Sequence, residues 1–313
     1  MNDQLHISVI TPVYKCKNSL DELYERLNTT LYKINHNFEI IMIDDSSPDD
    51  AWEKILHLSQ KDKKVKGIKL SKNFGQHSAI TAGLNYAKGK WIVVMDCDLQ
   101  DKPEEISKLY NKAIEGYDIV LGKRHQRKDN LMTRFLSKLF YKTLSYFTSN
   151  DFDERIAQFG IFSNKVLETL KQFEEQNRAF ALIMFLNIVG FKKTEIDIEH
   201  LERKEGKSSY SLSKKVNMAI NLIVSHSNKP LILSIKIGFL ISLFSFTYGF
   251  WLIIKYFIWG INIQGWTSVM VSVYFIGGLL FANIGLVGFY ISKVFDETKK
   301  RPIYIIEETT FKL

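Results

Sequence analysis

Short apolar runs alternate with amphipathic segments along the first 125 residues of the chain. The runs are rich in β-branched residues and have the length of strands, and the segments after the first four carry apolar residues at helical spacing. Strands are expected at 6–13, 38–44, 65–70, 91–96 and 117–122, and helices at 18–35, 48–60, 76–87 and 103–115. This alternation predicts an α/β domain with a doubly wound, mostly parallel sheet.

The pattern changes in the C-terminal third, where two long apolar stretches replace the alternation. Residues 230–259 contain only Lys236 and Lys255 as charged residues, and residues 267–292 contain none. Each stretch exceeds the roughly 20 apolar residues that a bilayer crossing requires. Buried helices of a soluble protein are the alternative, but two such runs in succession favour transmembrane helices, at about 231–258 and 267–292.

Basic residues lie on both outer flanks of this pair: Lys229 before it, and Lys293, Lys299, Lys300 and Arg301 after it. By the positive-inside rule, both flanks are expected in the cytoplasm. The N-terminus has no basic segment followed by an apolar core, so no signal peptide is expected. The spans are therefore expected to anchor a cytoplasmic domain to the cell membrane as a multi-pass protein.

The expected organisation has three parts. Residues 1–229 form the cytoplasmic domain, residues 230–292 hold the two spans, and residues 293–313 form a cytoplasmic tail. The tail segment DETKKRPIYIIEE (296–308) is expected to be solvated or to pair with a neighbouring subunit. The sequence thus leaves open whether the protein is a homo-oligomer.

Composition and charge narrow the function classes. The chain has 42 lysines and arginines against 34 acidic residues, a net charge of +8 that suits nucleic acid, an anionic membrane or a phosphorylated substrate. The basic residues concentrate beside the apolar pair and beside an amphipathic helix expected at about 131–148, so nucleic acid is not an expected partner. Two cysteines, Cys16 and Cys97, offer no disulfide framework, and a reducing compartment is expected.

Polar residues gather where the predicted strands end, and ligands of doubly wound sheets bind at the carboxyl ends of strands. No glycine-rich dinucleotide fingerprint or P-loop is present. After the fourth strand come Asp96, Asp98 and Gln100, whose oxygens could bind Mg²⁺ or Mn²⁺ together with substrate phosphates. Acidic residues are also ordinary turn formers and helix caps, and the spacing alone does not decide between these readings.

Together the motifs resemble the family 2 glycosyltransferases, and more narrowly their polyprenyl-phosphate group. The resemblance spans almost the whole chain, and the motifs follow in the family's order. The matching stretches are ISVITPVY (7–14), IIMIDDSSPDD (40–50), the segment 69–106 with its KNFGQHS and MDCDLQD motifs, GKR…R…RFLSKLFY (122–141) and the segment 190–214. The resemblance implies a GT-A-type fold.

The resemblance also implies roles for individual residues. Asp98, Gln158 and Arg203 take the catalytic positions, and Asp96, Asp98 and Gln100 take the metal positions. The nucleotide-sugar pocket corresponds to Pro12, Tyr14, Asp44, Asp45, Asn73, Gln76 and Asp96. The lipid-phosphate positions are Arg124, Arg127, Arg134 and Ser137, on or beside the amphipathic helix.

Three departures from the family pattern are visible. Lys15-Cys16 stands where Asn-Glu often follows the P-x-Y turn, which puts one donor contact in doubt. Gln158 replaces an aspartate proposed as a base, so it could only position a group. His200 stands in place of a cation and is expected to be structural.

The resemblance therefore implies an inverting transferase dependent on Mg²⁺ or Mn²⁺. It would move one sugar from a UDP- or GDP-sugar to polyprenyl phosphate at the cytoplasmic membrane face. Two alternatives stay open: an acceptor that is a surface polysaccharide or glycolipid, and a catalytically silent scaffold, for which Gln158 is the best support. The sugar, the base, the lipid length and the pathway are not predicted.

Overall fold

The computed structural model describes most of the chain and divides it into two units. The described residues are 5–124, 140, 142–143, 145–147, 155–174, 189–199, 220, 223–224, 227–259, 265–299 and 301–312. The first unit consists of Met1–Lys142, Asn150–Ser208 and Lys300–Leu313, and the second of Thr143–Ser149 and Ser209–Lys299.

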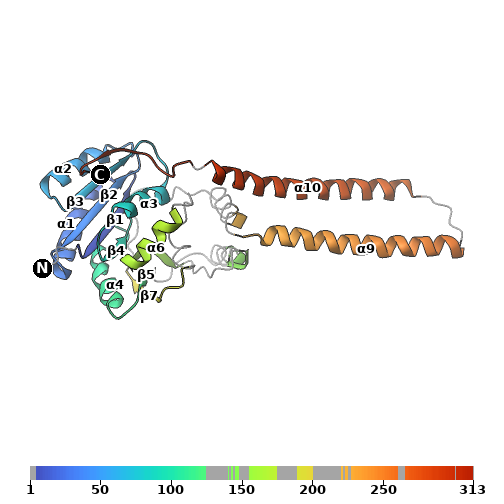
Figure 1. Ribbon diagram of the computed structural model, residues 1–313, viewed down its shortest axis with the longest axis horizontal. Coiled ribbons are helices and arrows are strands. Elements are labelled where there is room, and N and C mark those ends of the chain that lie inside the picture. Colours follow the sequence, from blue (N-terminus) through green and yellow to red (C-terminus); the bar gives the residue numbers. More distant parts are fainter. Residues whose placement is uncertain are drawn as a thin grey trace. The chain divides into compact units, whose positions relative to one another are not determined.

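The described part of the first unit is built on a mixed eight-stranded sheet with the order β7-β5-β6-β4-β1-β2-β3-β8 (Figure 1). Its strands are β1 (Ile7–Val13), β2 (Phe38–Asp44), β3 (Val65–Leu70), β4 (Trp91–Val94), β5 (Ile119–Arg124), β6 (Ile156–Ser163), β7 (Lys193–Ile198) and β8 (Ile306–Thr309). Strands β1 to β4 are mutually parallel, and β6 runs antiparallel between β4 and β5. The expected doubly wound α/β fold is confirmed, with antiparallel strands β6 and β8 added to it.

Helices cover both faces of the sheet. The helices are α1 (Leu20–Ile34), α2 (Ala51–Lys61), α3 (Gln76–Tyr86), α4 (Ile106–Ala113) and α6 (Asn164–Glu174), with 3-10 turns η1 (Lys17–Ser19) and η2 (Pro103–Glu105) before α1 and α4. Helices α1, α2 and α4 share one apolar core with the sheet, and α3 and α6 share the other. Leucines at helical spacing in α1, such as Leu20, Leu23, Leu27 and Leu31, are fully buried there, each contributing about 1.5–3 kcal/mol.

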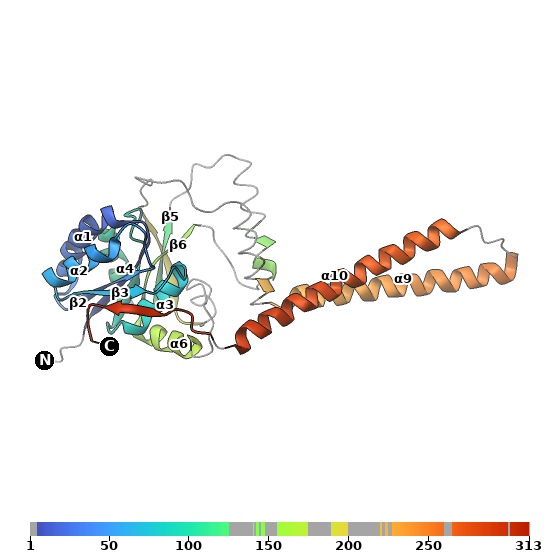
Figure 2. The same ribbon diagram turned by 90° about the horizontal axis from the view of Figure 1, so that it is seen from above.

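The C-terminal segment differs from the expected solvated or subunit-pairing tail. Residues 306–309 form β8, which pairs antiparallel with β3 of the same chain and closes that edge of the sheet (Figure 2). The backbone of Gly67 and that of Thr310 are joined by an N–H···O bond of 3.0 Å, and the Gly67 amide donates to the Thr310 hydroxyl at 2.8 Å. Trp52 Nε1 donates to the Glu308 carboxylate at 3.0 Å. The tail was misjudged because its partner strand lies some 240 residues upstream.

The second unit contains two long apolar helices, α9 (Lys229–Trp259) and α10 (Trp266–Thr298). Within them, Lys229–Leu252 and Val271–Asp296 are long and apolar enough to cross a membrane, each with a mean hydropathy of 1.8. Large side chains along both helices are exposed, among them Phe257 at 81% and Phe281 at 77%. The alternative of two core helices in a soluble protein predicts buried side chains, so this exposure argues against it.

Polar contacts link α10 to α9 and to the residue Ser227 just before α9. Ser234 donates to the side-chain oxygen of Asn283 at 2.5 Å, and the Tyr290 hydroxyl donates to the carbonyl of Ser227 at 2.7 Å. In membrane proteins, interhelical hydrogen bonds of this kind help to hold helices together. Lipid tails are as apolar as the helix side chains, so the hydrophobic effect does not drive the helices to associate. Of the amphipathic helix expected at about 131–148, the described residues 140, 142–143 and 145–147 are helical.

Candidate active site

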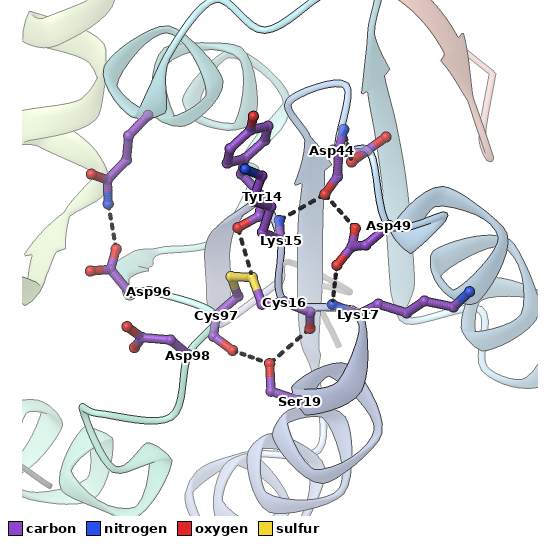
Figure 3. The surroundings of a disulfide bond; sticks show 12 residues. Tyr14, Lys15, Cys16, Lys17, Ser19, Asp44, Asp49, Asp96, Cys97 and Asp98 are labelled. Carbon is purple, nitrogen blue, oxygen red and sulfur yellow. Dashed lines mark hydrogen bonds between the residues drawn. A yellow bond between two sulfur atoms is a disulfide. The ribbon is translucent and has the colours of Figure 1, made fainter. Parts of the chain in front are cut away.

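The loops that follow β1, β2, β3 and β4 meet at the carboxyl edge of the parallel strands, where ligands of such sheets bind. Figure 3 shows the β1 turn lying between Asp44 and Asp49 on one side and Asp96 and Asp98 on the other. Every non-glycine residue with positive φ in the described chain lies in these loops: Lys15, Ser46, Asp50 and Leu99. Left-handed backbone costs about 1–2 kcal/mol for such residues, and such strain clusters at functional sites.

Asp45 fixes the loop between β3 and α3. One of its carboxylate oxygens accepts the amide of Phe74 at 2.7 Å, and the other accepts the amide of Gly75 at 2.9 Å. Gly75 has φ of 92°, a conformation that L side chains rarely adopt, and it immediately precedes α3. Asp45 is 2% exposed. It therefore shapes the loop that carries Asn73 and Gln76, and the exposed Asn73 side chain lies on that loop.

Asp44 ends β2 and is buried, at 1% exposure. It accepts the backbone amide of Ser47 at 3.1 Å. Burial raises the pKa of Asp44 to about 6, with Asp49 and Asp45 adding to the rise, while the Ser47 amide and Lys69 oppose it. The ionised carboxylate of Asp44 therefore lowers the stability of the folded protein.

Replacing Asp44 with asparagine is expected to stabilise the folded protein at pH 8. The folded-state pKa of about 6 lies above the ordinary 3.8, so the stability of the wild type falls as the pH rises from about 4 to 6 and stays lower above it. Asparagine keeps the acceptor for Ser47 and removes the charge, which predicts a gain of about 2 kcal/mol at pH 8 and little gain at pH 4. Thermal unfolding at both pH values measures it.

The matched control for this prediction is Asp50→Asn in the same loop. Asp50 is exposed, has φ of 56°, and makes only a long ion pair of 3.7 Å with Lys17 among the contacts described. Asparagine tolerates left-handed backbone, so this variant is expected to be neutral. An Asp44→Asn protein no more stable than wild type at pH 8 would contradict the prediction.

Asp96, Asp98 and Asp101 place three carboxylates in the loop after β4. Gln76 donates from its amide nitrogen to Asp96 at 2.6 Å, which joins the start of α3 to this loop. Asp98 accepts the backbone amide of Gln100 at 3.2 Å, and Asp101 pairs with Arg124 Nη2 at 3.3 Å. Burial, then the charges of Asp98 and Asp101, raise the pKa of Asp96 to about 6, while Arg124 and Gln76 act to lower it.

This donor set fits a hard divalent cation. Carboxylate and amide oxygens are the ligands that Mg²⁺ and Mn²⁺ take, and such ions share their coordination with substrate phosphates. The pKa of Asp96 is raised first by burial and then by the negative charges of Asp98 and Asp101, and a bound cation would offset those charges. Among the described residues no group of three or more His, Cys, Asp or Glu side chains is placed so that it could hold a metal ion by itself. Oxygens from a diphosphate would therefore have to complete the coordination.

Gln158 lies on β6, and its amide nitrogen is 3.4 Å from Nδ1 of His77 on α3. Burial lowers the pKa of His77, which favours the neutral imidazole. A neutral ring can accept from the amide, and this contact orients Gln158. His77 is not predicted from the sequence as a site residue, because nothing in the spacing shows that α3 and β6 meet at this point.

The β1 turn is held to its neighbours on both sides. Pro12 is buried within β1, and the Tyr14 ring after it is 43% exposed and able to stack on a base. The amide of Lys15 donates to the Ser47 hydroxyl at 2.7 Å, and that of Lys17 donates to Asp49 at 2.9 Å. These contacts bind the turn to the β2 loop.

On its other side, a disulfide joins the turn to the β4 loop. Cys16 and Cys97 are bonded, with Cα atoms 6.3 Å apart and a sequence separation of 81 (Figure 3). The expectation of cysteines without a disulfide is therefore wrong for this structure. Each cysteine follows one of two adjacent parallel strands, β1 and β4, and this adjacency brings the sulfurs together.

Several predicted site residues lie outside the described residues. These are Arg127, Arg134 and Ser137 of the lipid-phosphate set, the catalytic-position Arg203, and His200. Arg124 is described, and it pairs with Asp101 rather than standing apart from the acidic loop. Within the described chain its Nε is buried and has no hydrogen-bond partner.

The chain is similar in sequence to proteins of one family. The model for "Glycosyl transferase family 2" matches residues 8–171. The "Prophage bactoprenol glucosyl transferase homolog" of Escherichia coli is 33% identical, over 97% of this chain and 99% of that protein. The "Undecaprenyl-phosphate 4-deoxy-4-formamido-L-arabinose transferase" of Klebsiella pneumoniae is 29% identical, over 96% and 92% of the two chains. A mannosyl-3-phosphoglycerate synthase structure from Rubrobacter xylanophilus superposes with a TM-score of 0.48 at 13% identity, covering 71% and 73%.

Proposed function

The chain belongs to glycosyl transferase family 2, and from that premise we propose that it moves one sugar from a UDP- or GDP-sugar to polyprenyl phosphate, with inversion at the anomeric carbon. Two relatives whose names specify bactoprenol or undecaprenyl phosphate align with it over nearly their whole length. The proposal includes the cytoplasmic membrane face as the place of reaction.

The donor nucleotide is assigned to the edge formed by the β1, β2 and β3 loops. Tyr14 offers an exposed ring for the base, and Asn73 offers an exposed amide on the β3 loop. Asp44 and Asp45 support the pocket indirectly. Both are buried, and their carboxylates accept backbone amides of the surrounding loops. Lys15 is exposed in the same turn as Tyr14, and its charge bears on which donor is accepted.

The diphosphate and its divalent cation are assigned to the β4 loop. Asp98 and Gln100 would ligate the ion, and Asp96, held by Gln76, lies beside them. The ion, when bound, would supply positive charge against the negative charge that develops on the leaving diphosphate. The protein itself holds the oxygens of Asp96, Asp98 and Gln100 in place, because the β4 loop follows a strand of the sheet and is hydrogen-bonded to Gln76 at the start of α3.

The acceptor phosphate is assigned to the basic segment that begins at Arg124. The buried Nε of Arg124, without an acceptor among the described residues, is a donor that a phosphate oxygen would satisfy. Arg127, Arg134 and Ser137 follow in the same segment and are assigned to the same role. In the second unit, Lys229 at the start of α9 lies 4.9 Å from the ring centroid of Tyr146, so the end of the amphipathic segment meets the base of the apolar hairpin.

The nucleophile in this scheme needs orientation rather than deprotonation. A lipid phosphate is already ionised near neutral pH, so the glutamine at position 158 does not remove a required base. Gln158, oriented by His77, would donate from its amide to a reacting or neighbouring oxygen. The proposed reaction therefore does not require an aspartate at position 158.

The pairing of β8 with β3 supports a hairpin that enters and leaves the bilayer on one side. Strand β3 precedes the two apolar helices in the chain and β8 follows them, yet both strands belong to one sheet. An even number of crossings satisfies this constraint, and a single crossing does not. With basic residues on both flanks, that side is assigned to the cytoplasm.

The observation that carries the proposal is the carboxylate cluster of Asp96, Asp98 and Asp101 beyond β4, with the pKa of Asp96 raised to about 6. The test uses the full-length protein in detergent with Mn²⁺, short-chain polyprenyl phosphate and a panel of UDP- and GDP-sugars. We expect release of nucleoside diphosphate with one donor, and only when the lipid phosphate is present. Binding of nucleotide without lipid-dependent release would point to a different acceptor or to a silent scaffold. Failure to bind any nucleotide would refute the proposal.

A further inference from the structure

We propose that the Cys16–Cys97 pair is a thiol–disulfide exchange site, and that its redox state sets the affinity of the active site for the metal–nucleotide pair. The inference rests on the proposed function, because it concerns the same loops. The co-reactant is a dithiol such as a reducing oxidoreductase or dithiothreitol. The proposal is based on the position of the disulfide between two loops of the candidate active site.

The disulfide joins two loops that carry different halves of the donor site. Cys16 lies two residues after Tyr14, in the turn assigned to the base, and Cys97 lies between Asp96 and Asp98, in the loop assigned to the diphosphate. Both loops begin at the carboxyl ends of adjacent parallel strands, β1 and β4. A covalent link at this point couples the spacing of the two half-sites directly.

Strained backbone lies on both sides of the link. Lys15, next to Cys16, has φ of 57°, and Leu99, two residues after Cys97, has φ of 59°. Neither is a glycine, so each conformation persists only where the surroundings impose it. The disulfide is one of the constraints imposed on both loops, and breaking it gives both loops freedom to relax.

Non-covalent contacts keep the loops near each other after reduction. The Ser19 hydroxyl lies 2.8 Å from the carbonyl of Cys16 and 2.6 Å from that of Cys97. A serine hydroxyl has one proton, so it satisfies one carbonyl fully or shares weakly between both. The amides of Lys15 and Lys17 still bond to the β2 loop. Reduction is therefore expected to loosen the site rather than to unfold it.

The exchange reaction requires only the dithiol as co-reactant. A thiolate of the dithiol attacks Sγ of Cys16, which is partly exposed whereas Cys97 is 7% exposed, and the bond to Cys97 breaks. The second thiol of the reagent then attacks the mixed disulfide and releases Cys16. Two electrons and two protons pass from the dithiol to the cysteines, and the reagent leaves as a disulfide. The reverse reaction with an oxidised dithiol restores the bond.

The test compares both redox states of the full-length protein in detergent. One sample is treated with oxidised dithiothreitol and another with the reduced reagent, and each reagent is removed without oxygen. Maleimide labelling and mass measurement verify the number of free thiols. Calorimetry then measures the affinity for UDP and for GDP, each with Mn²⁺. We expect about tenfold tighter binding of one nucleotide in the oxidised state, equivalent to ordering roughly one backbone residue.

Cys16→Ser provides the matched variant, because it removes the link and leaves the loop around Asp96 and Asp98 unchanged in sequence. Its nucleotide affinity is expected to equal that of the reduced wild type and to be the same after oxidising and reducing treatment. Equal affinities in two verified redox states, or cysteines that cannot be closed by the oxidant, would overturn the inference and leave the proposed function standing. Absence of nucleotide binding in both states would overturn the proposed function and the inference together.

Discussion

Asp98→Asn is expected to reduce the rate of lipid-dependent nucleoside diphosphate release by on the order of 1,000-fold or more. The carboxylate is assigned as a direct ligand of the divalent ion, and the stabilisation that such an ion gives to a leaving diphosphate amounts to several kcal/mol. Each 1.4 kcal/mol or so corresponds to about a tenfold change in rate. Steady-state assays with saturating Mn²⁺ and donor measure the effect.

The asparagine variant is chosen because it keeps the local structure. Its side-chain oxygen can still accept the backbone amide of Gln100, as Asp98 does at 3.2 Å. Asp21→Asn is the control, since Asp21 lies on α1 in a surface ion pair with Lys54, and such pairs contribute little. The control should retain wild-type activity. If Asp98→Asn kept more than a tenth of it at unchanged thermal stability, the assignment of Asp98 to the metal would be wrong.

Deleting residues 302–313 is expected to lower the free energy of unfolding of the sheet unit by several kcal/mol. The deletion removes β8 and exposes the backbone amides and carbonyls of β3, including those of Gly67. It also leaves the buried Trp52 without its acceptor, Glu308. Each unsatisfied buried polar group costs about 1–3 kcal/mol, and an unpaired edge strand promotes aggregation. Thermal unfolding monitored by tryptophan fluorescence, with light scattering for aggregation, measures both effects.

Two point variants separate strand pairing from surface charge. Thr310→Val removes the hydroxyl that accepts the Gly67 amide at 2.8 Å, and should cost about 1–2 kcal/mol. Glu307→Gln breaks a partly exposed ion pair with Lys69, and should cost under about 1 kcal/mol. A truncated protein as stable as the full chain would show that β8 does not contribute to the sheet in solution.

The sequence was most informative where local pattern alone determines structure. The buried run Phe38–Asp44 matches β2 at both ends, because every residue of it is buried and no helical spacing competes. The acidic residues after the fourth predicted strand do lie beyond β4, at the carboxyl end of a parallel strand where ligands of such sheets bind, and their role in binding stays a prediction. These predictions needed no knowledge of which strands are neighbours.

The structural features that the sequence did not predict, or predicted wrongly, depend on contacts between distant segments. Strand β8 is four residues long and half-exposed, so its sequence carries little pattern of its own. The bond between Cys16 and Cys97 requires β1 and β4 to be adjacent, and the contact of His77 with Gln158 requires α3 and β6 to meet. A side-chain role such as that of Asp45, whose two oxygens hold backbone amides of another loop, is likewise determined by tertiary structure.

The order of β8 in the chain has a consequence for how the protein is made. Its sheet includes a strand that is synthesised after both apolar helices. Domains generally fold during synthesis from the N-terminal end, but here β3 lacks its partner on one side until Ile306–Thr309 has been made. The sheet is therefore completed only after both apolar helices have been synthesised.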